Sequence, residues 1–357
     1  MTIEELIYEA SDNECSDIHI TVGTNLATRR FGKLTISEDD LPAEEAKQLI
    51  LDLLTREEKN YVLNGGDLDV GVVINNEIRV RANVYHQRNN LAASIRLLQK
   101  EVPTFRQLGL PDVVRDFAEL PHGLVLVTGP TGSGKSTTLA SMVNHINKNT
   151  ACHIMTIEDP IEYIYPHQKA MIHQRELGRD VDDYATALRS AMREDPDIIL
   201  VGEMRDFDTI SAALSAAETG HLVLSTLHST SASQTVERII DASPIDAQAQ
   251  IRIQFANVLA GVVTQQLIPL ANGKGRVVAA EIMVATPAVK NLIRDNKSIQ
   301  IQNAIQSGKK YGMTLMDEEI INLTRSGKIT PQDAIKYAPD PPSMAKQLHM
   351  FTGFLAP

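Results

Sequence analysis

The chain contains 357 residues, more than one compact core usually organises, so its length predicts two domains. Hydrophobic residues make up 43% of it and charged residues 22%, which excludes extended disorder, and the formal net charge of −11 disfavours binding of nucleic acid through a broad basic face. The two cysteines, Cys15 and Cys152, have no CxxC spacing, so neither a zinc module nor a disulfide framework is expected.

The N-terminal residues are acidic and lack the basic and apolar regions of a secretion signal. No stretch approaches the ~18 apolar residues that a membrane-spanning helix needs. Together with the scarcity of cysteine, these features predict a protein that is made and kept in the cytoplasm.

Residues 1 to about 100 have the mixed pattern of an α/β domain. Apolar residues recur at helical spacing in two segments and follow strand patterns in four others. The stretch Asn75-Asn76-Glu77 supplies the turn residues of a hairpin between two of those strands. The expected helices are residues 4–10 and 42–54, and the expected strands are residues 17–22, 69–74, 78–85 and 91–97.

Pro103, Gly109 and Pro111 fall in a segment without a sustained period, so residues 101–120 are expected to connect two domains. From residue 121 onward, strand-like runs alternate with helical ones, a rhythm typical of a parallel sheet covered by helices. The expected strands of this second domain are residues 124–128, 153–157, 197–201 and 222–226.

After about residue 245 the pattern predicts helices, so a helical part is expected to follow the sheet. Pro339, Pro341 and Pro342 are then expected to end regular structure, leaving residues 344–357 as a short tail. The expected helices are residues 247–267, 287–294, 298–307, 314–326 and 331–337.

A glycine-rich loop with the sequence GPTGSGKS follows the apolar run at residues 124–127 and leads into a helical pattern. Its glycines let successive backbone N–H groups turn toward phosphate oxygens at a helix N-terminus. Lys135 is expected to reach the β- and γ-phosphates of a nucleoside triphosphate, and the Ser136 hydroxyl to bind a bridging Mg²⁺. The residues expected to bind the nucleotide are Gly129, Pro130, Thr131, Gly132, Ser133, Gly134, Lys135, Ser136 and Thr137.

A carboxylate is also needed near the Mg²⁺ and its water, and Glu203 is placed to supply one. The four apolar residues at 198–201 predict a strand that is buried on both faces, and Glu203 follows its carboxyl end, where ligands bind in parallel sheets. We therefore expect Glu203 to act as the general base or to position the attacking water, and to bind Mg²⁺ partly through water.

A second acidic group, Glu158, Asp159 and Glu162, follows the expected strand at residues 153–157. Three carboxylates within five residues repel one another unless a cation or hydrogen-bond donors offset their charge, as beside Mg²⁺ and ATP. A catalytic role near the γ-phosphate is expected for Glu158 and Glu162, and Glu158 is a candidate metal ligand. The alternative is a solvated loop with a helix-capping acid.

His221 and His228 flank the strand-like run at residues 222–227. At ~3.3 Å per residue the two ends of such a strand lie about 20 Å apart, too far for both imidazoles to bind one metal ion. Each histidine is therefore a candidate either for a nucleotide or interface contact or for an ordinary structural hydrogen bond.

Arginines are expected to offset the charge that develops on the γ-phosphoryl group, supplied from a neighbouring element or subunit. Arg79 and Arg81 lie on one face of an expected strand, with Arg88 and Arg96 nearby in sequence. A solvated strand face is the alternative. Weaker candidates in the second domain are Arg193, Arg205 and Arg238.

Four motifs together resemble the secretion ATPases of type IV pili and type II secretion, and more narrowly the retraction ATPases of twitching motility. They are GPTGSGKST at 129–137, TIEDPIE at 156–162, REDPDIILVGEMRD at 193–206 and AAETGHLVLSTLHSTSA at 216–232. SDIHI at 16–20 and RVRANVYHQR at 79–88 resemble the N-terminal PAS-like domain of that family.

The resemblance implies a PAS-like α+β domain at residues 1–100, a linker at 101–120, and a RecA-like P-loop domain at 121–357 with C-terminal helices from about 245. It implies a homohexamer in which ATP lies between the two domains of one subunit and is reached by N-terminal arginines. By matching positions, the resemblance makes Glu203 the catalytic glutamate and Glu162 the acidic-box carboxylate. It makes His221 and His228 the histidine-box pair, and it carries over Arg79, Arg81 and Arg96.

The segment AVKNLIRD at residues 288–295 resembles the retraction-type motif AIRNLIRE. Assembly ATPases of this family usually have a larger N-terminal region and a zinc module with paired CxxC, and this chain has neither. We expect a pilus retraction ATPase that works at the inner face of the cytoplasmic membrane with the platform protein of the pilus machinery and without nucleic acid.

Departures from the motif at Val289, Lys290 and Asp295 leave an accessory retraction paralogue open as an alternative. A VirB11-like secretion traffic ATPase or nucleic-acid translocase is a second alternative, and a DNA-stimulated ATPase rate would favour it. A nucleotide-gated structural subunit that barely hydrolyses ATP is a third.

Overall fold

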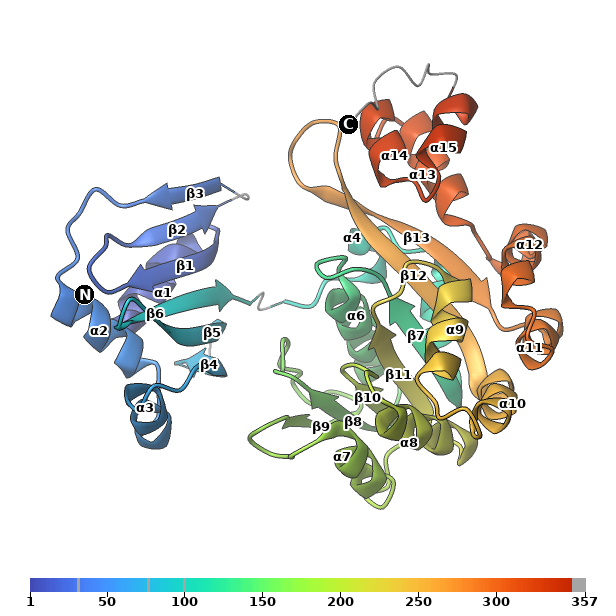
Figure 1. The fold of residues 1–357 in the computed structure, drawn as a ribbon, viewed down its shortest axis with the longest axis horizontal. Coiled ribbons are helices and arrows are strands. Elements are labelled where there is room, and N and C mark those ends of the chain that lie inside the picture. Colours follow the sequence, from blue (N-terminus) through green and yellow to red (C-terminus); the bar gives the residue numbers. More distant parts are fainter. Residues whose placement is uncertain (31–32, 76–77, 99–100, 349–357) are drawn as a thin grey trace. The chain divides into compact units, whose positions relative to one another are not determined.

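The structure is a computed structural model that describes residues 1–30, 33–75, 78–98 and 101–348. Contacts between residues divide the chain into two compact units (Figure 1). The first unit comprises Met1–Glu101 with Pro160–Ile164, and the second comprises Val102–Asp159 with Tyr165–Pro357.

The first unit is built on a six-stranded sheet in the order β3-β2-β1-β6-β5-β4, with all neighbouring strands antiparallel. Its elements are α1 (Ile3–Asp12), β1 (Cys15–Thr21), β2 (Ala27–Arg30), β3 (Lys33–Ile36), α2 (Ala43–Asp52), α3 (Arg56–Leu63), β4 (Leu68–Ile74), β5 (Ile78–Gln87) and β6 (Asn90–Leu97). Val80, Ala82 and Val84 of β5 are buried and alternate with more exposed residues. They share a core with Ile7 of α1 and Ile50 of α2.

Period-two and helical patterns therefore predicted most of this unit correctly. The expected helices correspond to α1 and α2, and the expected strands to β1, β4, β5 and β6. The strands β2 and β3 and the helix α3 were not predicted, because the first two are only partly buried or exposed and show no apolar alternation. The predicted turn includes Asn76 and Glu77, which lie outside the described residues.

The second unit contains a seven-stranded sheet in the order β13-β12-β7-β11-β10-β8-β9, parallel except for the edge strand β13. Its strands are β7 (Gly123–Thr128), β8 (His153–Glu158), β9 (Met171–Glu176), β10 (Ile198–Val201), β11 (Leu222–Leu227), β12 (Leu259–Pro269) and β13 (Arg276–Val284). The central strands β7, β10 and β11 are buried along their whole length. All four strands predicted for this domain are confirmed.

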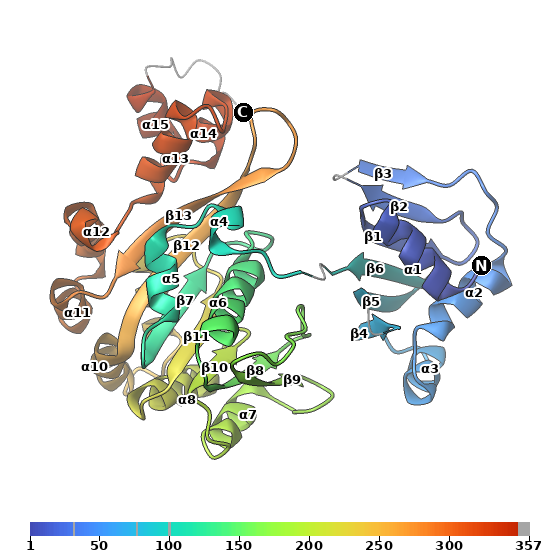
Figure 2. The same cartoon turned by 180° about the vertical axis from the view of Figure 1, so that it is seen from behind.

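Helices cover both faces of this sheet. Those nearest to it are α4 (Phe105–Leu108), α5 (Asp112–Ala118), α6 (Lys135–Asn149), α7 (Tyr184–Ala191), α8 (Phe207–Glu218), α9 (Ala232–Asp241) and α10 (Gln248–Val258). Figure 1 shows α8, α9 and α10 in front of the sheet, and Figure 2 shows α4, α5 and α6 in front of its other face. The architecture is α/β with helices on both sides of a mostly parallel sheet.

The predicted helix over residues 247–267 is wrong beyond Val258. The helix α10 ends there, and β12 starts at Leu259 and pairs in parallel with β7. The strand β12 is mostly buried, so its apolar residues fit a helical period even though the chain is extended. The β-branched run Val262-Val263-Thr264 favours the strand. The partner strand β13 was also missed, so the region after residue 245 is not purely helical.

Residues 101–120, which were expected to connect two domains, contain regular structure that was not predicted. They contain α4 and α5, and both helices contact α6. The ring of Phe117 in α5 lies on the backbone of Gly261 in β12, where a Cβ would come within 2.1 Å of the ring. The hydroxyl of Ser141 in α6 also donates a hydrogen bond to the Pro103 carbonyl oxygen at 2.7 Å. These helices were missed because they are too short to show a helical period.

The C-terminal helices follow the β12–β13 hairpin. They are α11 (Pro287–Arg294), α12 (Ile301–Ser307), α13 (Met316–Arg325), α14 (Pro331–Tyr337) and α15 (Pro341–Gln347). Three of them, α12, α13 and α14, contact the strands of the hairpin. Regular structure was predicted to end at the prolines near residue 340, but Asp340 caps α15 and Pro341 occupies its first turn, where a missing N–H costs nothing. Met344, which was expected in a tail, is fully buried. It belongs to a small hydrophobic core that also contains Ile268 of β12 and Ala279 of β13. No helix in the described part of the chain is long and apolar enough to cross a membrane.

Candidate nucleotide-binding and hydrolysis site

The glycine-rich loop joins the end of β7 to the start of α6, as predicted. Gly129 has φ +143°, and a Cβ on it would lie 2.2 Å from the Gln265 carbonyl oxygen and 2.6 Å from the Ser133 hydroxyl. Gly134 caps α6 in the left-handed conformation. Only glycine fits both positions, and the loop curls over the N-terminus of a long helix, where anions bind.

Two polar groups of this loop are arranged for an anionic ligand. The ammonium group of Lys135 is 2.9 Å from the Gly129 carbonyl oxygen and 3.1 Å from that of Pro130, so the cation lies over the loop. The Ser133 hydroxyl is buried and has no hydrogen-bond partner among the described residues. A cation and an unused hydroxyl beside a glycine cradle fit the phosphate groups of a nucleotide.

Gln265 holds the loop in place from the neighbouring strand β12. Its side-chain amide donates to the Ser133 carbonyl oxygen at 2.8 Å and accepts from the Thr138 hydroxyl at 2.9 Å, and the residue is only 1% exposed. Sequence reasoning missed Gln265 because it placed this segment in a helix. The available signal was a pair of amides, Gln265 and Gln266, within an otherwise mostly apolar run.

A Gln265→Leu variant is expected to bind nucleotide roughly tenfold more weakly. The two lost hydrogen bonds stabilise the binding conformation of the loop by about 1–2 kcal/mol, and binding would have to supply this free energy. Titration with a fluorescent ATP analogue measures this. The matched control is Gln266→Leu, which removes a hydrogen bond of 2.8 Å to the Tyr337 carbonyl oxygen, away from the loop. Equal affinity losses in the two variants would contradict the assignment.

Glu203 lies just beyond β10, at the same edge of the sheet as the glycine-rich loop at residues 129–136, called the phosphate loop below. Hydroxyls of the neighbouring strand β11 fix this turn: Ser225 donates to the Val201 carbonyl oxygen at 2.7 Å and Thr226 to that of Gly202 at 2.6 Å. Because only β11 separates β7 from β10, two strand spacings of ~4.8 Å place the start of the loop and Glu203 roughly 10 Å apart.

The Glu203 carboxylate is only 14% exposed and both of its oxygens are paired. Its Oε2 is 2.8 Å from Nε of Arg205, and its Oε1 is 3.2 Å from Nε2 of His228. The hydrogen bond and charge of Glu203 raise the pKa of Arg205. His228 follows β11, so the structure brings one predicted histidine to the predicted carboxylate, and Arg205 joins them.

His221 lies at the opposite edge of the sheet. It precedes β11, its carbonyl oxygen accepts a hydrogen bond from the Gly123 N–H at the start of β7, and its Nδ1 is 2.8 Å from the Ala216 carbonyl oxygen. Within the second unit His221 therefore makes structural hydrogen bonds and is not brought to Glu203.

The acidic group is divided between the two units. Glu158 ends β8, which lies beside β10, and its Oε1 accepts hydrogen bonds from the Thr156 hydroxyl at 2.7 Å and the Gln174 amide at 3.3 Å. Asp159 follows it in the second unit, whereas Glu162 belongs to the segment Pro160–Ile164, which groups with the first unit. Glu158 and Glu203 thus lie at the ends of adjacent parallel strands.

The predicted arginines of the first unit lie in a row of charges across its sheet. Arg81 faces Arg96 across β5 and β6, and each has a carboxylate partner on its other side. Nη2 of Arg81 is 2.6 Å from the Asp69 carboxylate, and Nε of Arg96 is 2.9 Å from the nearly buried carboxylate of Asp17. Arg79 lies two residues before Arg81 on the same face of β5. Arg81 and Arg96 are therefore held by ion pairs within their own sheet.

Glu281 of β13 anchors the helix that follows the histidine segment. Its buried carboxylate accepts a hydrogen bond of 2.8 Å from the N–H of Ala232, the first residue of α9, and another from Met316, the first residue of α13. Burial raises the pKa of Glu281, although these two N–H donors oppose the shift. One side chain therefore caps two helices.

The raised pKa of Glu281 predicts a pH-dependent contribution to stability. Below the ordinary pKa of about 4.3 the contribution is fully present, and it is lost as pH rises through the higher pKa of the folded state. The difference in unfolding free energy between wild type and Glu281→Gln is therefore expected to decrease as pH rises above about 4.3. Urea unfolding of both proteins from pH 4 to pH 7 measures it, and a difference that grows with pH would contradict this prediction.

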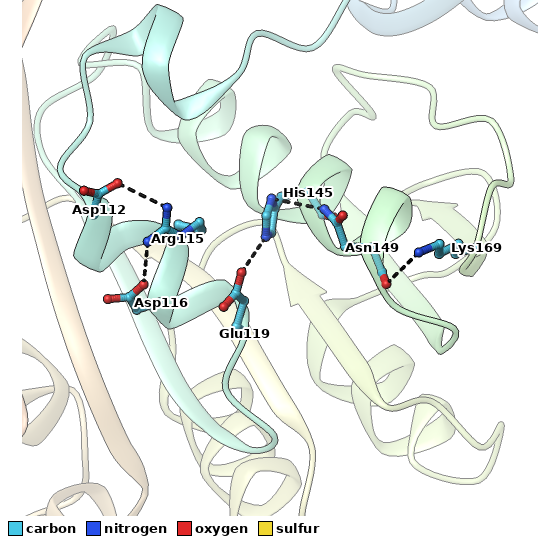
Figure 3. A network of polar contacts seen from close by, with 7 residues as sticks. All are labelled: Asp112, Arg115, Asp116, Glu119, His145, Asn149 and Lys169. Atoms are coloured by element: carbon cyan, nitrogen blue, oxygen red, sulfur yellow. Dashed lines mark hydrogen bonds and ion pairs between the residues drawn. The ribbon is translucent and has the colours of Figure 1, made fainter.

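A polar network ties α6 to its neighbours (Figure 3). His145 of α6 lies 2.9 Å from a carboxylate oxygen of Glu119, at the end of α5, and 3.3 Å from the side-chain amide of Asn149. Lys169 donates to the Asn149 carbonyl oxygen at 3.3 Å. The end of α6 away from the phosphate loop is thereby fixed, which supports the position of its N-terminus.

The donor set at this edge suits a hard cation. Mg²⁺ prefers oxygen ligands and usually takes only one or two from protein when phosphates supply others. The Ser136 hydroxyl in the first turn of α6 and the carboxylates of Glu158 and Glu203 at neighbouring strand ends provide this chemistry. Among the described residues, no three His, Cys, Asp or Glu side chains gather as metal ligands.

Comparison with known proteins gives concordant results. The family model described as type II/IV secretion system protein matches residues 1–333. The chain is 42% identical to the type IV pilus retraction ATPase PilT of Pseudomonas aeruginosa over 96% of this chain and 99% of that protein. It is 34% identical to the type IV pilus ATPase PilU of the same organism, over 95% and 89% of the two chains.

Among solved structures, the pilus retraction motor PilT with bound ADP superposes with a TM-score of 0.90 at 42% identity, covering 97% of this chain and 99% of that one. Sequence and fold thus agree with this relative over almost the whole chain. The protein belongs to the type II/IV secretion ATPase family.

Proposed function

We propose that this chain hydrolyses ATP to power retraction of type IV pili. One observation carries the proposal: a complete phosphate loop and a paired Glu203 lie at one sheet edge in a chain that is 42% identical to a pilus retraction ATPase along nearly its whole length. The lower identity of 34% to PilU makes the accessory role the less favoured alternative.

Each step of the proposed reaction has a residue to perform it. Lys135 exchanges its loop carbonyl partners for phosphate oxygens and offsets their charge. Glu203 orients the attacking water and accepts its proton, while His228 holds the carboxylate through Oε1. Bound Mg²⁺, held by Ser136 and through water by Glu158 and Glu203, would neutralise charge on the phosphoryl oxygens.

The proposal includes the assembly expected for this family. The chain would act as a homohexamer at the inner face of the cytoplasmic membrane, with the pilus platform protein as partner. Arg79, Arg81 and Arg96 would assist hydrolysis, which requires Arg81 and Arg96 to exchange Asp69 and Asp17 for phosphate.

Deleting the gene in its own organism tests the proposal. Cells are expected to keep surface pili that no longer retract in fluorescence microscopy, and the wild-type gene is expected to restore retraction. A gene that encodes the Lys135→Ala variant should not restore retraction. Deleted cells whose pili retract at the normal rate would contradict the proposal.

A further inference from the structure

A tyrosine that the proposed mechanism does not use lies among its carboxylates. Tyr184 is the first residue of α7, and Asp183 fixes that position by capping the helix with a hydrogen bond of 2.8 Å from the Thr186 N–H. The ring of Tyr184 packs against the main core of the second unit. A rigid helix start on a packed core therefore places the hydroxyl.

That hydroxyl lies between the ends of β8 and β10. The Cβ position on Gly202 is 2.8 Å from the Tyr184 hydroxyl oxygen, 3.3 Å from the Ile157 carbonyl oxygen and 3.5 Å from the Glu158 Cα. Glu158 belongs to one of these strand ends, and Glu203 directly follows Gly202 on the other. The hydroxyl is thus adjacent to the backbone that carries both carboxylates.

The same contact explains why residue 202 is glycine. Gly202 does not have a positive φ, so its conformation does not require glycine. A side chain there would instead collide with the Tyr184 hydroxyl, since 2.8 Å is shorter than real Cβ contacts. The glycine of this motif makes room for the hydroxyl.

The charges around Tyr184 suit a hydrogen-bond donor. Burial raises the pKa of Tyr184, and the negative charges of Asp159, Glu158 and Glu203 raise it further. The phenol therefore keeps its proton. Its O–H can donate a hydrogen bond to one of these carboxylates or to a water molecule between Glu158 and Glu203. Such a donor offsets the mutual repulsion of Glu158 and Glu203.

We propose that Tyr184 is a positioning residue for ATP hydrolysis, whose hydroxyl donates a hydrogen bond into the space between Glu158 and Glu203 and so holds Glu203 or its water in line for attack. The inference rests on the proposed ATPase function. It adds a residue from α7 to those proposed to take part in hydrolysis, and it explains why position 202 requires glycine.

The test is steady-state ATP hydrolysis by full-length Tyr184→Phe, which keeps the ring and removes one oxygen. Loss of one well-placed hydrogen bond is expected to lower kcat about tenfold. Affinity for a non-hydrolysable ATP analogue should stay within about twofold and the thermal midpoint should stay unchanged, because the packing is kept. The control is Tyr311→Phe, the same change at a half-exposed tyrosine, which should retain the wild-type kcat.

A double-mutant cycle with Gly202→Ala separates positioning from packing. The added methyl group is expected to displace the hydroxyl and lower kcat by itself, but to have a smaller further effect in Tyr184→Phe, where the collision with the hydroxyl is gone and only the 3.3 Å approach to the Ile157 carbonyl oxygen remains. Equal kcat for wild type and Tyr184→Phe, or fully additive effects in the cycle, would overturn the inference. Absence of hydrolysis by the wild type would instead refute the proposed function.

Discussion

A Lys135→Ala variant is expected to lose ATP hydrolysis by roughly a thousandfold or more in kcat, the largest effect that a single change should produce in this chain. The ammonium group already lies within 3.1 Å of two loop carbonyl oxygens, so a small movement brings it to the β- and γ-phosphates. No other side chain of the loop carries a positive charge. Release of phosphate by the purified protein measures the loss.

Lys148→Ala is the matched control for this variant. Lys148 lies in the last turn of the same helix, α6, and its side chain is exposed. The Lys148→Ala variant should hydrolyse ATP at the wild-type rate. Both variants should retain the wild-type thermal midpoint within a few degrees. A Lys135→Ala protein that turned over ATP normally would refute the assignment of the loop.

The positions of the glycine-rich loop and of Glu203 in the fold could be predicted from sequence because they follow short, local rules. The phosphate loop needs its glycines between a strand and a helix, and Glu203 follows a run of four buried apolar residues. These signals depend on neighbours in the chain, so they survive without knowledge of the tertiary structure.

The order of the strands could not be predicted in the same way. Only the structure places β11 between β7 and β10, and that order brings His228 beside Glu203. Parallel strands do limit the choice, because His228 follows β11 at the carboxyl edge whereas His221 precedes it. The length of the strand predicted that the two histidines lie far apart, and the structure places them at opposite ends of β11.

Buried elements limited the prediction most. In β12 residues 261–265 are all buried, so no alternation between buried and exposed positions distinguishes strand from helix there. Gln265 was lost together with the strand, and Glu281 was lost with β13. Both are buried polar residues whose partners come from distant parts of the chain, and such pairings are invisible to local patterns.

A Glu203→Gln variant is expected to bind ATP but to hydrolyse it about a thousandfold more slowly, because an amide keeps the shape of the side chain and cannot accept the proton of the attacking water. The loss in kcat should greatly exceed any loss in affinity, since the phosphates are expected to be held by Lys135 and the loop. Phosphate release gives the rate, and binding of a fluorescent ATP analogue gives the affinity.

Structural damage from this change should be small. Arg205 loses its ionic partner, Oε2 of residue 203, in this variant. Because the Arg205 side chain is 70% exposed, water can solvate its guanidinium group, and the ion pair contributes little to stability. Glu237→Gln on α9 is the matched control and should leave both rate and affinity unchanged. If Glu203→Gln weakened ATP binding as much as hydrolysis, Glu203 would act by holding the nucleotide. A role in activating water requires the two quantities to separate.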